Sequence, residues 1–184
     1  MRVVGGTYRG RTLLSPEGQT TRPTSDRAKE GVFNMLSSLL QKEGKLWKEV
    51  TFLDGFAGSG AIGIEALSHG AKFVYFVEKE RSALKILHQN LEKCLEGNHQ
   101  VLGQDILTLP LSKTSVDVLF LDAPYQKGLW QKALETLLKA GYISSKTLLI
   151  IEMEKGEEAS LPKGFYPLSM RSFGRPQFLF AKVR

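Results

Sequence analysis

Short apolar stretches alternate with amphipathic helical stretches from residue 50 to residue 153, and this alternation constrains the fold more than any other feature of the sequence. The apolar stretches are rich in Val, Ile, Leu and Phe, as expected for strands that are buried on both faces. Strands are predicted at residues 50–53, 73–77, 100–102, 116–121 and 147–153, and helices at 61–68, 80–95 and 129–140. This order predicts an α/β fold with a parallel sheet, helices on both faces and right-handed crossovers.

The two ends of the chain do not follow this alternation. Residues 1–21 are predicted to form short extended pieces broken by glycines, and a helix is expected to begin after Thr24 or Ser25 and to end at Gly44. Near the carboxyl terminus, the segments 165–173 and 177–183 predict an antiparallel hairpin around a Gly-Arg-Pro turn. A chain of 184 residues has the size of one domain. We therefore expect a single domain over residues 1–184, with an N-terminal hairpin extension (1–21) and a core (22–184).

A glycine-rich turn joins the first predicted strand to the helix after it, and it points to a ligand site. The turn includes Asp54, Phe56, Ala57, Gly58, Ser59 and Gly60. With Gly63 it fits the G-x-G-x-x-G pattern, in which glycines allow a tight turn and close approach of a ligand to the backbone. Glu78 ends the next strand, where its carboxylate can reach a ribose hydroxyl pair. Nicotinamide dinucleotides and S-adenosylmethionine (SAM) both remain possible at this point.

Two further carboxylates favour SAM over a nicotinamide dinucleotide. Asp54 lies directly before the turn, where it would repel a pyrophosphate but suits the cationic amino group of a methionine moiety. Asp105, followed by Ile106, comes after the third strand and offers an acceptor for an adenine amino group, although it could equally cap a helix.

The fourth strand ends in Asp122-Ala123-Pro124-Tyr125, which suits the methylation of an exocyclic amine. The lone pair of such an amine is delocalised into the base, so the amine is a poor nucleophile. Asp122 and the carbonyl of Ala123 can accept its two N–H hydrogen bonds and direct the lone pair outward. Pro124 favours an extended Ala123, and Tyr125 can stack on an extruded base.

The combination of this turn with the Asp54–Gly60 loop resembles the SAM-dependent amino-group methyltransferases. More specifically, the chain resembles the RsmD family of bacterial 16S rRNA guanine-N2 methyltransferases over essentially its whole length. The matching segments are residues 2–11, Arg22-Pro23-Thr24-Ser25-Asp26-Arg27, Phe33-Asn34 and the 53–60 loop. The sequence departs from the family at Ala123, where the family has a first proline. The carbonyl that accepts the hydrogen bond is retained, but the turn is less rigid.

The resemblance implies a Rossmann-like fold with a mostly parallel seven-stranded sheet, and methyl transfer from SAM to N2 of one guanine in small-subunit rRNA. It implies catalytic roles for Asp122, Ala123, Pro124 and Tyr125. It implies SAM binding by Asp54, Phe56, Ala57, Gly58, Ser59, Gly60, Glu78, Lys79, Asp105 and Ile106. It places Arg9, Arg11, Arg22, Thr24, Arg27 and Arg175 in contact with RNA.

The positive charge is concentrated at the two ends of the chain. The net charge is +6, yet residues 1–16 carry three arginines and residues 159–184 carry five Lys or Arg, with no acid in either segment. Basic segments on a slightly acidic body suggest a polyanionic partner. We expect both to lie near the strand edge that carries Asp122.

Several expectations are negative, and two alternative functions remain open. One cysteine, Cys94, and three scattered histidines predict neither a disulfide framework nor a metal site. The amino-terminal residues lack the apolar region of a signal peptide, so a cytoplasmic location is expected. The protein is also expected to be a monomer. The acidic run 152–158 is predicted to be a solvated loop, and Trp130 to pack in the core. An N6-adenine or other nucleic-acid amino-methyltransferase is the first alternative; a nicotinamide-dependent oxidoreductase and a non-catalytic RNA-binding factor are further ones.

Overall fold

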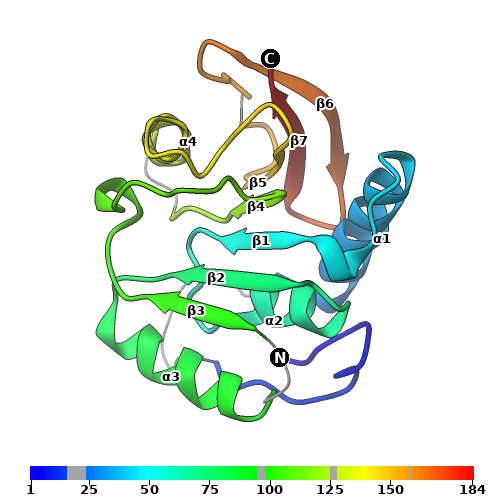
Figure 1. The fold of residues 1–184 in the computed structure, drawn as a ribbon. Helices are drawn as coiled ribbons and strands as arrows, with labels where there is room; N and C mark the ends of the chain where they lie inside the picture. The colour runs from blue at the N-terminus through cyan, green and yellow to red at the C-terminus, as the bar shows by residue number, and fades with distance from the viewer. Residues whose placement is uncertain (16–23, 95–97, 125–127, 158) are drawn as a thin grey trace.

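The fold was analysed in a computed structural model, which describes residues 1–15, 24–94, 98–124, 128–157 and 159–184. Five helices or helical turns and four strands make up the first part of the molecule (Figure 1): α1 (Asp26–Lys42), η1 (Trp47–Glu49), β1 (Thr51–Asp54), α2 (Ala61–Ser68), β2 (Phe73–Val77), α3 (Arg81–Glu92), β3 (His99–Leu102), η2 (Ile106–Thr108) and β4 (Val118–Leu121). The remainder comprises α4 (Leu129–Lys139), β5 (Leu148–Met153), β6 (Phe165–Ser172) and β7 (Gln177–Val183). Every strand and helix predicted from the sequence is present, with differences of a few residues at the ends.

The strands form one seven-stranded sheet in the order β3-β2-β1-β4-β5-β7-β6. The first five are parallel to one another, whereas β7 is antiparallel to both β5 and β6. The mostly parallel sheet with a C-terminal antiparallel hairpin is therefore confirmed. Since Gln177 pairs with Met153 at the end of β5, the turn between β6 and β7 lies at the carboxyl edge of the parallel strands.

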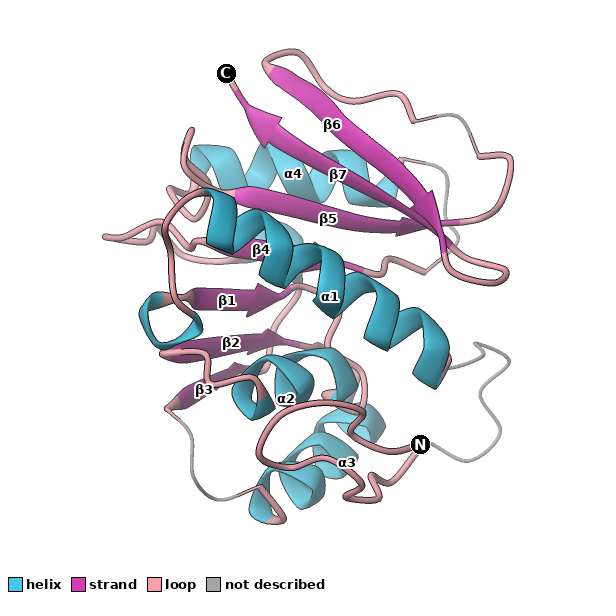
Figure 2. Ribbon diagram, turned by 90° about the vertical axis from the view of Figure 1, so that its right-hand side faces the viewer, coloured by secondary structure: helices cyan, strands magenta, loops and turns pink. Residues whose placement is uncertain are grey.

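Each face of the sheet is covered by its own helices and its own apolar core. On one face, α1, α2 and α3 pack on side chains such as Phe52, Phe76 and Phe120 (Figure 2). On the other face, α4 and η2 pack on side chains such as Leu53, Leu119 and Ile151. Neighbouring residues of one strand thus belong to different cores, which explains why these strands are apolar throughout. Trp130 lies in the second core, as predicted.

Helix α1 begins where the sequence predicts and is capped by a side chain. The Oγ of Ser25 accepts a hydrogen bond from the backbone N–H of Ala28 at 3.2 Å, which satisfies one of the free amides of the first turn. Residues 1–15 form a loop closed by one antiparallel bridge between Arg2 and Thr12, which is less regular than the predicted hairpin. No helix in the described ranges is long and apolar enough to cross a membrane.

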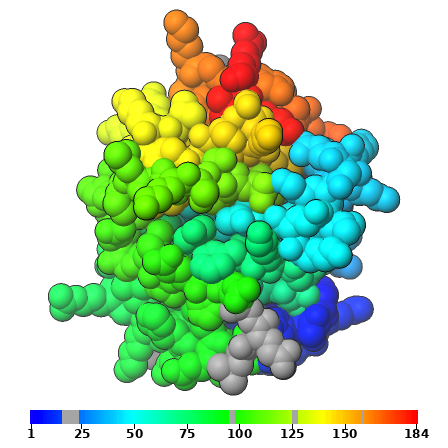
Figure 3. All heavy atoms as spheres, viewed as in Figure 1, coloured from blue at the N-terminus to red at the C-terminus, as the bar shows by residue number. Residues whose placement is uncertain are grey.

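The amino-terminal and carboxyl-terminal segments lie at opposite ends of the molecule. Figure 3 shows the first residues (blue) at the bottom and the C-terminal hairpin (orange to red) at the top. The expectation that both basic segments lie at the edge carrying Asp122 therefore needs correction for the N-terminal loop, whose position is described below.

Candidate active site

The glycine turn after β1 combines an open position with two tightly packed ones. Gly58 has a φ of +55°, and a Cβ built on it would meet no atom within 4 Å, so a ligand can approach its backbone. Gly60 has a φ of +83° and precedes the first residue of α2. A Cβ on Gly63 would lie 2.2 Å from Cε1 of Phe76, so this glycine allows α2 to pack closely on β2. Glycine is therefore favoured at each of the three positions for a different structural reason.

Asp54 is buried at the carboxyl end of β1, and a hydrogen bond from α2 holds it in place. Its Oδ2 accepts from the backbone N–H of Gly63 at 2.9 Å, and the residue is only 2% exposed. Burial raises the pKa of Asp54 to about 7; the negative charges of Asp122 and Glu78 add to this rise, and the Gly63 N–H opposes it. This carboxylate would be ionised more readily beside a cation.

Glu78 follows β2 and fixes the position of the glycine turn. Its Oε2 accepts from the N–H of Gly58 at 2.8 Å, and its Oε1 accepts from the N–H groups of Lys79 and Glu80, both at 2.8 Å. A carboxylate has about four acceptor positions, so one remains for a ligand hydroxyl. Glu78 thus supports the turn and remains available for the ribose role predicted for it.

Asp105 both caps a helical turn and forms an ion pair. Its Oδ1 accepts from the N–H of Leu107 at 3.0 Å, which caps η2, and its Oδ2 lies 3.0 Å from Nζ of Lys79. The Leu107 N–H and the Lys79 ammonium hold the pKa of Asp105 below its usual value. Ile106 is buried behind it. Lys79, predicted as a cofactor residue, therefore lies beside Asp105 and pairs with it.

The Asp122-Ala123-Pro124 turn directly follows β4 at the same edge of the sheet. Ala123 is buried, Pro124 is exposed and Asp122 is intermediate. Burial raises the pKa of Asp122 to about 6. Tyr125, the fourth residue predicted for this turn, lies outside the described residues. Of the other residues predicted around the glycine turn, Phe56 is half-buried, whereas Ala57 and Ser59 are buried.

One buried carboxylate at this edge was missed by sequence reasoning. Glu152 is part of β5 and is 9% exposed, so its assignment to a solvated loop was wrong. Its Oε2 accepts a hydrogen bond of 2.9 Å from the hydroxyl of Thr24, which lies just before α1. Burial raises the pKa of Glu152 to about 8; the charge of Asp122 adds to the rise, and the Thr24 hydroxyl opposes it. A carboxylate directly after the apolar run 148–151 was the signal that could have identified it.

Asp54, Asp122 and Glu152 form a row on one face of the sheet. Asp54 pairs in register with Phe120, and Phe120 pairs with Ile150. Asp122 and Glu152 follow these partners by two residues, and residues two apart in a strand share a face. Among the described residues, no ion pair involves any of the three, although each has a raised pKa.

Glu152 lies at the other end of the row from the glycine turn, whereas Asp54 and Asp122 fit the cationic groups of SAM. Its ammonium and sulfonium groups would compensate negative charges that no described cation neutralises. The open backbone at Gly58 and the acceptors on Glu78 and Asp105 fit the rest of the molecule. A pyrophosphate would instead bring negative charge beside Asp54.

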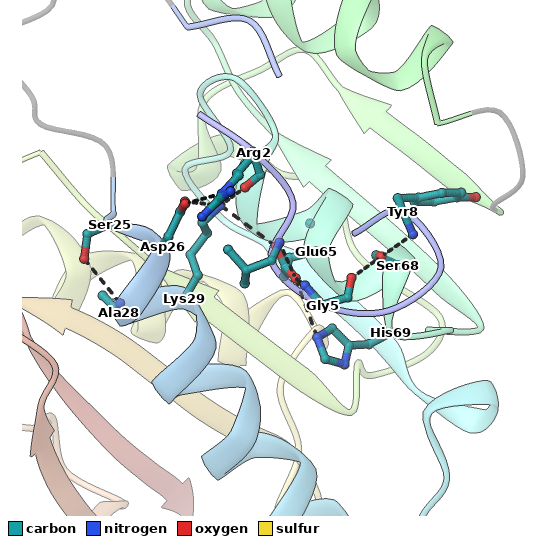
Figure 4. A network of polar contacts seen from close by, with 12 residues as sticks. Arg2, Gly5, Tyr8, Ser25, Asp26, Ala28, Lys29, Glu65, Ser68 and His69 are labelled. Carbon is teal, nitrogen blue, oxygen red and sulfur yellow. Dashed lines mark hydrogen bonds and ion pairs between the residues drawn. The ribbon is translucent and has the colours of Figure 1, made fainter. Parts of the chain in front are cut away.

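The N-terminal loop is anchored on α2 and α1 through buried charges (Figure 4). Glu65 of α2 accepts hydrogen bonds from the N–H groups of Val4 at 3.0 Å and Gly5 at 2.6 Å. Nζ of Lys29 lies 3.9 Å from Glu65 and donates to the carbonyl of Arg2. Both charged side chains are fully buried, so this network holds the loop firmly.

The tip of this loop lies at the far end of α2 from the glycine turn. The N–H of Thr7 donates to the carbonyl of Ser68, the last residue of α2, at 2.8 Å. Arg9 and Arg11 are exposed in this region, and Arg11 also donates to the carbonyl of Lys93. The prediction that they lie near the Asp122 edge was therefore wrong. The helix directs the loop away from it.

The other residues predicted to contact RNA lie closer to that edge. Thr24 contacts Glu152, Arg27 is exposed in the first turn of α1, and Arg175 is exposed in the turn between β6 and β7. Arg22 lies outside the described residues.

Solved structures of other proteins share this fold. The Escherichia coli protein yhhF superposes with a TM-score of 0.83 at 27% identity, covering 100% of this chain and 98% of that one. A magnesium protoporphyrin IX methyltransferase from Synechocystis PCC 6803, solved with bound SAM, has a TM-score of 0.61 at 17% identity, covering 91% and 87%. The fold is that of the α/β methyltransferases, and the carboxylates and the open glycine turn of the site fit SAM as the cofactor.

Sequence comparison gives the family. The family model described as "Conserved hypothetical protein 95" matches residues 1–182. "Ribosomal RNA small subunit methyltransferase D" of Haemophilus influenzae is 34% identical over 179 residues, covering 95% of this chain and 89% of that protein. The chain belongs to this family, the RsmD family.

Proposed function

We propose that this protein transfers the methyl group of SAM to the exocyclic N2 of one guanine in small-subunit rRNA. The observation that carries the proposal is the Asp122-Ala123-Pro124 turn beside the carboxylate of Asp54, in a chain whose relative is named for small-subunit rRNA methylation. SAM, when bound, supplies an electrophilic methyl group at this edge of the sheet.

In this proposal the acceptors of the turn activate the amine. Asp122 accepts one N–H of the guanine amine and the carbonyl of Ala123 accepts the other, so that the nitrogen lone pair points out of the plane of the base. Ala123 is buried and Asp122 is half-buried, so few water molecules compete for these hydrogen bonds. Pro124 favours an extended Ala123, and the role proposed for Tyr125 is to stack on the base.

The cofactor residues divide into charge partners and shape-forming groups. Asp54 pairs with the methionine ammonium, Glu78 with the ribose hydroxyls and Asp105 with the adenine amine. The remaining residues of this set form the walls of the site: Phe56, Ala57, Gly58, Ser59, Gly60, Lys79 and Ile106.

RNA is held by exposed basic groups on both sides of this edge. Thr24, Arg27 and Arg175 lie around the target base, with Arg22 in the same segment as Thr24. Arg9 and Arg11 contact RNA farther from the reacting atoms. The protein acts as a cytoplasmic monomer, on the small subunit or its precursor.

The direct test uses small subunits from a strain that lacks this methylation. Incubation with labelled SAM should place the label on N2 of a single guanine, mapped by nuclease digestion and mass spectrometry. Asp122→Ala should abolish transfer while SAM affinity stays within a few-fold, and the exposed Glu135→Gln should behave like the wild type. Label on an adenine, or equal labelling of DNA, would exclude the proposal.

A further inference from the structure

Glu152 has a position that neither packing nor SAM binding explains. It is a carboxylate within a strand whose preceding residues, Leu148 to Ile151, are all apolar and buried. Burying a carboxylate in such a strand is costly unless the carboxylate is paired with a cation or a ligand or is fully hydrogen-bonded. SAM already has Asp54 as a partner for its cationic group at the glycine turn.

The sheet register places Glu152 beside Asp122. Leu121 at the end of β4 pairs with Ile151 of β5, and the residues that follow them, Asp122 and Glu152, are close enough for the charge of Asp122 to act on Glu152. Adjacent strands lie about 4.8 Å apart, which brings two side chains on the same face within reach of one small ligand. On the other side of Glu152, β7 contributes Phe178, a buried apolar residue.

One oxygen of Glu152 is fixed by the protein and the other is open. Thr24 donates its hydroxyl to Oε2 at 2.9 Å, and this is the one hydrogen bond found for the carboxylate within the described residues. Thr24 belongs to a different element, the segment leading into α1. The contact therefore orients the carboxylate and leaves Oε1 as an acceptor next to Asp122.

We infer that Glu152 reads the target base, by accepting the ring N1–H of guanine while Asp122 and Ala123 hold the neighbouring amine. This rests on the proposed function. Guanine is the base that presents an amine next to a ring N–H; adenine and cytosine present an amine next to a ring nitrogen lone pair. An oriented acceptor at this position therefore favours guanine and disfavours the other two, as expected when a flipped base is read by its Watson–Crick edge. The acceptors of Asp122 and Ala123 alone give no such discrimination, because they contact only the amine.

The test compares two substrates that differ at N1. Once the modified position is mapped, the small-subunit RNA is prepared with guanine or with 2,6-diaminopurine there. Diaminopurine retains the 2-amino group but has a lone pair at N1. At pH 9, where the carboxyl group of Glu152 is mostly ionised, the wild-type protein should prefer guanine by about ten- to a hundredfold in kcat/KM, the range of a lost hydrogen bond to a charged acceptor.

Substitution of Glu152 should remove this preference. In Glu152→Gln the amide can present either an oxygen or an NH₂ group to N1, so the ratio of kcat/KM values should fall toward one. Thr24→Val should lower the ratio partly, because the carboxylate is then no longer oriented. Glu154→Gln, which changes an exposed acid just beyond the strand, should keep the wild-type ratio.

The outcomes distinguish recognition of the base by Glu152 from a purely structural role of this residue. A structural role for Glu152 would lower activity on both substrates equally, and an unchanged ratio in Glu152→Gln would refute the inference. If that variant is inactive on both, the ratio in Thr24→Val decides: a wild-type value there refutes it. Absence of preference in the wild-type protein also refutes it. If the wild-type protein places no methyl group on N2 of the guanine substrate, the proposed function itself fails.

Discussion

The buried carboxyl group of Asp54 predicts that SAM binds more tightly as the pH rises. Asp54 has a pKa of about 7 without ligand, and a bound cation would lower that pKa. Binding must therefore release a proton from the fraction of molecules in which Asp54 is protonated. By linkage, affinity rises with pH through the range in which the free protein loses this proton.

The size of the effect follows from the pKa. A carboxyl group with a pKa of about 7 is roughly one-tenth ionised at pH 6 and roughly nine-tenths ionised at pH 8. If the ionised form is the one that binds, SAM affinity rises about tenfold between these pH values. Asp122, with a pKa of about 6, is half ionised at pH 6 and adds about a further factor of two.

Isothermal titration calorimetry at pH 6, 7 and 8 and constant ionic strength measures this directly. Repeating the titration at pH 6.5 in two buffers of different ionisation enthalpy counts the protons released. Asp54→Asn keeps an oxygen for the Gly63 N–H but removes the charge, so it should bind SAM about ten- to a hundredfold more weakly at pH 8 and flatten the pH dependence. Glu135→Gln is the matched control on an exposed acid. Affinity that is constant or falls between pH 6 and 8 in the wild-type protein would refute the assignment of Asp54 and Asp122 to a cationic ligand.

Four further predictions follow from the packing and the surface. Gly63→Ala should lower the free energy of unfolding by about 1–3 kcal/mol in urea titrations, because its Cβ would overlap Phe76. Glu65→Ala should cost about 3–5 kcal/mol in the same assay, since it leaves the Lys29 ammonium buried beside lost backbone partners; a loss below 1 kcal/mol would contradict the proposed anchoring of the N-terminal loop. Ala123→Pro should leave methyl transfer equal or higher, because it restores rigidity without removing the carbonyl; a large loss of turnover in a folded variant would contradict this reading of the turn. Replacing Arg9 and Arg11 with Ala should weaken RNA binding and reduce its salt dependence by about one or two released ions while SAM affinity is unchanged, as measured by filter binding at several salt concentrations.

Much of the fold could be predicted because the sequence pattern is local. The strand 73–77 and the helix 61–68 have the predicted bounds, since continuous apolar runs and glycine stops are properties of neighbouring residues. The structure of the amino-terminal end of the chain was harder to predict from the sequence. The N-terminal loop has a single bridge, because its shape depends on Glu65 and Lys29, which are distant in sequence.

The candidate site could be predicted in its components but not in its connections. The glycine turn, Asp54, Glu78 and the Asp122 turn are each recognisable from position after a strand. The hydrogen bond between Glu78 and Gly58 and the ion pair between Asp105 and Lys79 could not be predicted, because they depend on side-chain geometry in the folded protein. Glu152 was assigned to solvent because an acid followed by further acids suggests a loop, whereas the register of β5 between β4 and β7 buries it.

The sequence by itself determined the alternating α/β order, the carboxylates at the ends of strands and the basic character of both chain ends. These depend on residue type and on spacing along the chain. Only the tertiary structure decided which carboxylates are neighbours and where the basic ends lie. Parallel pairing of β1, β4 and β5 brings Asp54, Asp122 and Glu152 onto one face, although nearly a hundred residues of chain separate the first from the last. The same packing moves Arg9 and Arg11 away from that edge, because buried hydrogen bonds to α2 determine the course of the N-terminal loop.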